Sequence, residues 1–110
     1  MSVADVLAVL EGELNSAPVR GPSEDLYQQM LLVGSRVVTL QRADLVGALR
    51  SWLEVRTEPR TMIGISLAEG LGLTELREDL DQLRADIVAG RAFLPHYVRW
   101  VDEALGKLQR

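Results

Sequence analysis

Apolar residues along this chain recur every three or four positions, which is the period of amphipathic helices. The first run contains Val3, Val6, Leu7, Leu10 and Leu14. Its carboxylates fall on the other side, so the pattern predicts a helix from residue 3 to about Asn15. The stretch "NSAPVRGPS", residues 15 to 23, holds two prolines and a glycine and predicts a loop. Ser23 or Asp25 is then placed to cap a second helix.

The segment "EDLYQQMLLVGSRVVTLQ", residues 24 to 41, is the hardest to assign. Leu26, Met30, Val33 and Val37 fit one stripe of a helix. The β-branched residues of 35 to 40 leave a strand open as an alternative. Because no second alternating run follows to complete a hairpin, we expect helix to Gly34 and onward to Leu40.

The apolar period predicts further helices in the rest of the chain. One covers "RADLVGALRSWLEV", residues 42 to 55, with Leu45, Leu49, Trp52 and Leu53 on one side and Arg42 and Arg50 on the other. The next lies in "TMIGISLAEGLGL", residues 61 to 73, and ends at the glycines of 70 to 72; Pro59, just before this segment, is acceptable in its first turn. The last begins at Pro95 and carries Tyr97, Val101, Ala104 and Leu108.

A helix from Thr74 to about Gly90 has the clearest division into two faces. Thr74 is placed to cap it, and early carboxylates suit the exposed amides of a first turn. Its apolar face is Leu73, Leu76, Leu80, Leu83 and Ile87. This face also has heptad spacing, so burial inside the domain is the simpler interpretation and a homodimer stays open.

Six helices with short connections predict one all-α domain over residues 1 to 110, with consecutive helices antiparallel. A globular bundle and a stack of helix pairs both satisfy this pattern. The segment "ISLAEGLGLTELREDLDQLRADI", residues 65 to 87, resembles the helix, glycine turn and helix of HEAT-type α-solenoids. The resemblance covers roughly residues 42 to 108 and implies a surface that binds other proteins.

Composition narrows the classes of function. A length of 110 residues with 47% hydrophobic content is typical of one domain. The net charge of −4 repels a phosphate backbone, so nucleic acid is not the expected partner. The absence of cysteine excludes disulfides and thiolate chemistry. Acidic residues interrupt the N-terminal apolar run, so we expect no signal peptide, no membrane association and a cytoplasmic location.

We predict no catalytic residue, cofactor or metal site. Catalytic nucleophiles need an adjacent base, usually a histidine, and the only histidine is His96, which cannot form a multi-histidine site. We interpret it as an exposed residue near a helix end, with a functional proton carrier as the alternative. The "EGLGL" stretch lacks the lysine of a phosphate loop. As a DNA recognition helix, residues 75 to 87 would turn five carboxylates toward a polyanion.

These observations favour a non-enzymatic protein-protein interaction module, in the class of inhibitor, immunity or adaptor proteins. It would present an acidic and partly aromatic helical surface to a partner with a basic surface. The predicted partner-binding residues are Glu75, Glu78, Asp79, Asp86, Tyr97 and Trp100. For the carboxylates a solvated helix face is the simpler interpretation, and for Trp52 it is core packing. The alternative class is a small-ligand-binding protein or enzyme with a pocket between helices.

Overall fold

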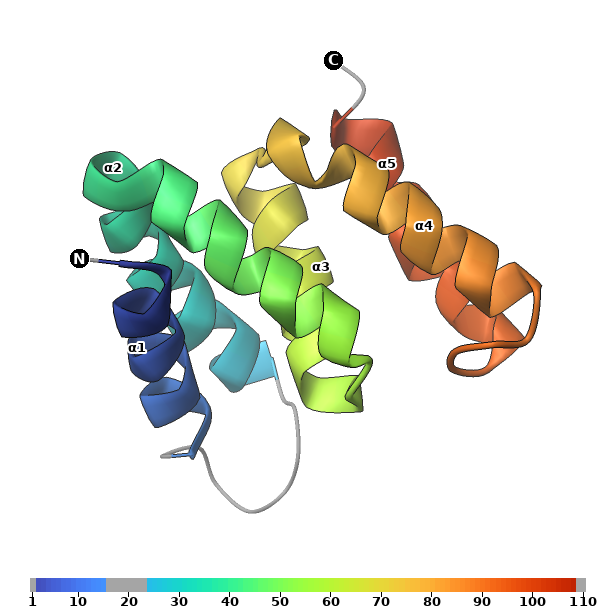
Figure 1. Ribbon diagram of the computed structural model, residues 1–110, viewed down its shortest axis with the longest axis horizontal. Coiled ribbons are helices and arrows are strands. Elements are labelled where there is room, and N and C mark those ends of the chain that lie inside the picture. Colours follow the sequence, from blue (N-terminus) through green and yellow to red (C-terminus); the bar gives the residue numbers. More distant parts are fainter. Residues whose placement is uncertain (1, 16–23, 109–110) are drawn as a thin grey trace.

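The computed structural model describes residues 2–15 and 24–108, and in this part of the chain it is all-α (Figure 1). The helices are α1 (Val3–Asn15), α2 (Glu24–Val55), α3 (Glu58–Leu71), α4 (Arg77–Val88) and α5 (Val98–Leu108), with the short 3₁₀ helices η1 (Thr74–Leu76) and η2 (Pro95–Tyr97). Beyond Asn15, the predicted loop at 15 to 23 lies outside the described residues, as do the side chains of the predicted caps Ser23 and Asp25. Helix α1 has the predicted bounds.

The predicted number of six helices is wrong, because the described residues form five α-helices. The helices expected at 24 to 40 and 42 to 55 are assigned as one element, α2. Only Gln41 inside it leaves the helical conformation, with φ −138° and ψ 46°. Figure 1 shows that both halves of α2, coloured cyan and green, lead away from this turn toward the same side of the view. The chain therefore reverses at Gln41 without a proline or glycine to separate two elements.

Residues 35 to 40 are helical, which decides the helix-or-strand alternative. Their hydroxyls find acceptors inside the helix: Ser35 Oγ donates to the Leu32 carbonyl at 2.8 Å and Thr39 Oγ1 to the Ser35 carbonyl at 3.1 Å. Val37 and Val38 are half-buried and pack against the core. Tertiary packing thus overrides the local β preference of these residues.

Helix α3 lies at the centre of the fold, between α2 and the α4–α5 pair (Figure 1). Its residues 61 to 65 are all buried, so it has no solvent face over this stretch. Proline is in its first turn as predicted. At its end Gly72 has φ 64°, and Leu73 N donates to the Ala68 carbonyl at 2.9 Å. This left-handed closure confirms the predicted glycine stop.

Helix α1 is tied to α2 and α3 through one carboxylate. Glu11 accepts a hydrogen bond from Trp52 Nε1 at 3.1 Å and two from Arg60 at 2.7 Å. The hydrogen bond from Arg60 lowers the pKa of Glu11. Trp52 is buried, which confirms its predicted place in the core.

The predicted apolar face of residues 73 to 87 is confirmed, since Leu73, Leu76, Leu80, Leu83 and Ile87 are all buried. The predicted cap is wrong, because Leu73 and Leu76, not Thr74, occupy the N-cap positions of η1 and α4, and neither position has a side-chain cap hydrogen bond. The chain enters α4 through η1, where Leu76 N donates to the Leu73 carbonyl at 2.9 Å. A main-chain bond therefore satisfies an amide that the threonine was expected to serve.

Candidate functional site

Two of the carboxylates predicted to bind a partner, Glu75 and Asp79, face arginines of α2. Glu75 accepts hydrogen bonds from Arg42 Nε at 2.7 Å and Arg42 Nη2 at 2.9 Å. The same Nη2 reaches the Gly72 carbonyl at 3.0 Å. Asp79 accepts from Arg50 Nε at 3.1 and 3.2 Å. The second half of α2 therefore supplies cations to η1 and α4, and the bond from Arg42 lowers the pKa of Glu75.

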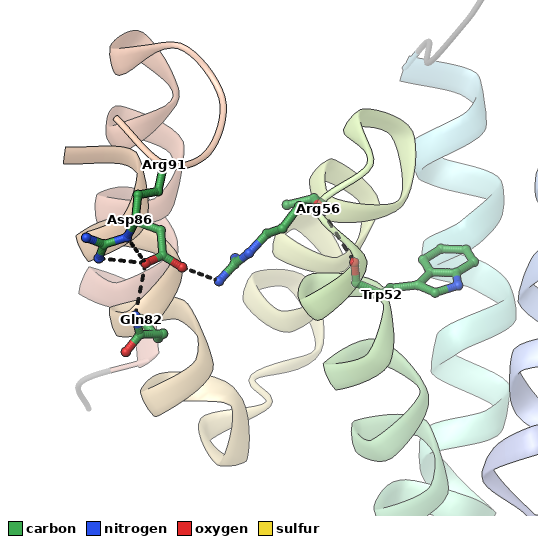
Figure 2. Close-up of polar contacts among 6 residues, drawn as sticks. Trp52, Arg56, Gln82, Asp86 and Arg91 are labelled. Carbon is green, nitrogen blue, oxygen red and sulfur yellow. Dashed lines mark hydrogen bonds and ion pairs between the residues drawn. The ribbon is translucent and has the colours of Figure 1, made fainter. Parts of the chain in front are cut away.

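Asp86 is the most extensively bonded of the predicted carboxylates. Figure 2 shows it between Arg56, just after α2, and Arg91, just after α4, with Gln82 one turn before it on α4. Its oxygens accept from Arg56 Nη2 at 2.7 Å, Arg91 Nη2 at 2.9 Å and Gln82 Nε2 at 3.0 Å. The hydrogen bond from Arg91 is the largest of the effects that lower the pKa of Asp86. Asp86 thus binds the turn that follows α2 and the turn that follows α4.

Arg56 also explains how α2 leads into α3. Its φ of 57° is left-handed, an uncommon conformation for a residue with a side chain. The ion pair with Asp86 holds the side chain that this turn directs toward α4 (Figure 2). We call the pairs Arg42–Glu75, Arg50–Asp79 and Arg56–Asp86, which join α2 and the residue after it to η1 and α4, the α2–α4 ion pairs.

Of the predicted acidic residues, only Glu78 is left without an intramolecular partner in the described part of the chain. It is exposed, together with Asp81 one turn away. Three of the four carboxylates predicted to meet a partner therefore meet arginines of this chain instead. Sequence reasoning placed Arg42 and Arg50 on the polar side of their helix but did not connect them to the acidic row.

The predicted aromatic residues Tyr97 and Trp100 lie together at the start of α5. Their rings meet edge to face with centroids 5.0 Å apart, and His96 stacks on Tyr97 at 4.4 Å. Tyr97 Oη donates to Glu58 Oε1 at 2.9 Å, and this bond raises the pKa of Tyr97. Trp100 is 41% exposed and remains available for contact.

A groove that sequence reasoning missed lies between the first half of α2 and α3. It encloses about 690 Å³ and is lined by Tyr27, Gln28, Leu31, Leu32 and Ser35 of α2 and Ser66, Leu67, Gly70 and Leu71 of α3. Leu31 and Leu32 are 37% and 48% exposed. No acidic, basic or histidine side chain lines it. The sequence feature that could have indicated the groove is the pair of leucines in "QMLLV", which lie outside the apolar stripe through Met30 and Val33.

Two glycines set the width of the groove. A Cβ on Gly34 would lie 3.0 Å from Leu71 Cδ1, and one on Gly70 would lie 2.8 Å from Leu31 Cδ1. Each glycine thus lets a leucine of the facing helix approach its backbone. The two helices pack closely at these points, and the leucines beside them form the walls.

A smaller cavity of about 260 Å³ adjoins the groove and shares Tyr27 and Ser66 with it. The rest of its lining is Met62, Ile65, Glu69, Trp100 and Glu103. We call it the Trp100 cavity. Its carboxylates contact exposed cations: Glu69 lies 2.7 Å from Lys107 Nζ, and Glu103 lies 3.9 Å from Arg99 Nε.

Comparisons of the chain with protein-family models, with curated proteins and with solved structures find no match. None of the helices in residues 2–15 and 24–108 is long and apolar enough to cross a bilayer. The same residues contain no group of three or more His, Asp or Glu side chains arranged to hold a metal ion. The candidate site is the groove together with the Trp100 cavity, because the two share Tyr27 and Ser66.

Proposed function

We propose that this protein is a non-enzymatic protein-protein interaction module that binds a helical segment of a partner in the groove between α2 and α3. The observation that carries the proposal is the exposed apolar wall formed by Leu31 and Leu32. An amphipathic helix laid between two helices buries such side chains with few polar requirements. The lining of the groove contains no carboxylate, histidine, lysine or arginine side chain.

The acidic surface takes a smaller part in this proposal than the sequence suggested. Glu75, Asp79 and Asp86 are bonded to arginines within the chain, and separating them would leave charges unpaired. Glu78 and the negative net charge remain to steer a basic partner during encounter. An inhibitor, immunity or adaptor role in the cytoplasm, with residues 42 to 108 acting as a HEAT-like stack within a single domain, belongs to the same proposal.

The test places a photo-crosslinking amino acid at Leu32 and exposes the protein in extracts of its native cells. The matched control carries the same amino acid at Val88, which is also exposed and apolar but lies on α4. We expect a discrete adduct from position 32 and none from position 88. A synthetic peptide of the crosslinked segment should then bind Leu32→Glu about 10 to 100 times more weakly than the unmodified chain, because a buried leucine contact is lost. Equal binding to both proteins would refute the proposal.

A small apolar ligand is the second candidate, because a groove of about 690 Å³ is within the size range of ligand pockets. A panel of small molecules that raises the thermal midpoint of the unmodified chain but not of Leu32→Glu would favour this class. An adduct between two copies of this chain would instead identify a homodimer. The crosslinking and thermal measurements together separate the three occupants.

A further inference from the structure

The groove and the Trp100 cavity adjoin each other, and the side chains that line them differ in charge. They meet at Tyr27 and Ser66, which line both. The groove has no charged lining, whereas the cavity contains the carboxylates of Glu69 and Glu103 and the rings of Tyr27 and Trp100. A segment bound along this surface would therefore leave an apolar region and enter an anionic, aromatic one.

Aromatic rings beside carboxylates suit a cationic group. A guanidinium or ammonium is attracted to a ring face by its quadrupole, most strongly for Trp. Carboxylates accept charge-assisted hydrogen bonds from the same cations. The chain already brings cations to both carboxylates, with Lys107 Nζ 2.7 Å from Glu69 and Arg99 Nε 3.9 Å from Glu103. Neither cation lines the cavity, whose own lining includes no positively charged side chain.

The internal cations are replaceable. The Lys107 and Arg99 side chains are 68% and 82% exposed, and ion pairs at such positions contribute little to stability. A cation covered by a bound helix would lie in a lower dielectric and interact more strongly with the same carboxylates. Burial, and after it the negative charge of the nearby Glu58, raises the pKa of Tyr27.

We infer that the partner helix carries a lysine or arginine close to its apolar contact residues and that this cation enters the Trp100 cavity. The inference rests on the function proposed for the groove. Tyr27 and Leu31 are one helical turn apart along α2, about 5.4 Å, so one or two turns of a bound helix reach from the groove into the cavity. The charge of −4 on the chain favours such a partner.

The probes are synthetic amphipathic helical peptides with leucines at helical three-four spacing, identical except for one position that flanks the apolar stripe. That position is Arg, Lys, Gln or Glu, scanned at both ends of the stripe. Dissociation constants are measured by fluorescence anisotropy on the unmodified protein. We expect the Arg and Lys peptides to bind about 10 times more tightly than the Gln peptide at one end of the stripe only. This comparison needs no protein variant.

Protein variants locate the effect. Glu69→Gln with Glu103→Gln should remove the preference for Arg and Lys. The charge-matched control is Glu78→Gln with Asp81→Asn, exposed carboxylates of α4 away from the cavity, which should keep it. Lys107→Gln should strengthen binding of the Arg peptide several-fold, because it removes an internal competitor for Glu69. Trp100→Leu should weaken it, because the ring face is lost.

The outcomes separate this inference from the proposed function. If all four peptides bind equally and Leu32→Glu abolishes their binding, the groove functions as proposed and the cation inference is wrong. If no peptide binds, or Leu32→Glu changes nothing, the proposed function fails and the inference falls with it. If both double variants lose the preference equally, overall charge explains it and the Trp100 cavity does not.

Discussion

The two halves of α2 meet the rest of the chain with opposite kinds of side chain. The second half sends Arg42 and Arg50 to carboxylates of η1 and α4, at distances of 2.7 to 3.2 Å. The first half forms one wall of a groove with Leu31 and Leu32, both more than a third exposed. The charged surface has its partners within the chain, and part of the apolar surface remains uncovered.

This contrast indicates which of the two surfaces is available to contact another molecule. The sequence draws attention to the carboxylates, yet three of the predicted ones have arginine partners already. A carboxylate that would face solvent on an isolated helix becomes part of the fold when another helix supplies an arginine to pair with it. Exposed leucines that line a groove, in contrast, lower the free energy only when something covers them. The uncovered apolar wall is therefore the better candidate for a binding surface.

The largest expected difference between the two regions is in stability. Leu80→Ala removes a fully buried side chain beside the α2–α4 ion pairs and should lower the free energy of unfolding by about 2 to 5 kcal/mol. Leu32→Ala in the groove should lower it by about 1 kcal/mol or less, because Leu32 is half exposed in the free protein. Urea denaturation followed by circular dichroism measures both. Similar losses would mean that the groove leucine is part of the core.

Two glycines, two positions apart, provide the next contrast. Gly72→Ala should cost about 1 to 2 kcal/mol, because φ is 64° and a side chain disfavours that conformation. Gly70→Ala should change stability by less than about 1 kcal/mol, since helix propensity improves while the exposed end of Leu31 shifts away from the new Cβ. The measurement is again the urea midpoint. A larger loss for Gly70→Ala would show that the groove wall is rigid.

The smallest expected effect depends on pH. The pKa of Glu75 is lowered in the folded chain, so its ion pair stabilises the fold above the unfolded pKa of about 4, and this contribution is lost as pH falls through the folded pKa. Glu75→Gln should lower the free energy of unfolding by up to about 1 kcal/mol at neutral pH, and this difference from the unmodified chain should disappear in acid. Leu32→Ala serves as control, because no carboxylate lines the groove and its gap should not depend on pH. A Glu75→Gln gap that persists in acid would contradict this role for the ion pair.

The helical class, the bounds of α1, the glycine stop after α3 and the buried face of residues 73 to 87 were all predictable. Each depends on a local pattern or on one turn residue. The number of helices differs because the two helices predicted on either side of Gln41 form one element, α2, that is interrupted only at that residue. The cap at Thr74 failed because main-chain bonds of a 3₁₀ turn replaced it.

The site was less predictable, since it depends on helices that are distant in sequence. Arg42 and Glu75 are 33 positions apart, so their pairing requires the packing of η1 against α2. The groove requires the close approach of α2 and α3 at Gly34 and Gly70, which no apolar period encodes. Trp52 and Trp100 were distinguishable because one lies on the apolar stripe of its helix and the other at an edge.

The burial of α3 over residues 61 to 65 also constrains how this chain folds. A helix of 14 residues without a solvent face there is marginal alone in water, so its stability depends on packing against α2 and α5. The α1–α2 segments at one end and the α4–α5 pair at the other are therefore coupled through a shared inner helix. The groove belongs to this assembled unit, since one of its walls exists only when the innermost helix is in place.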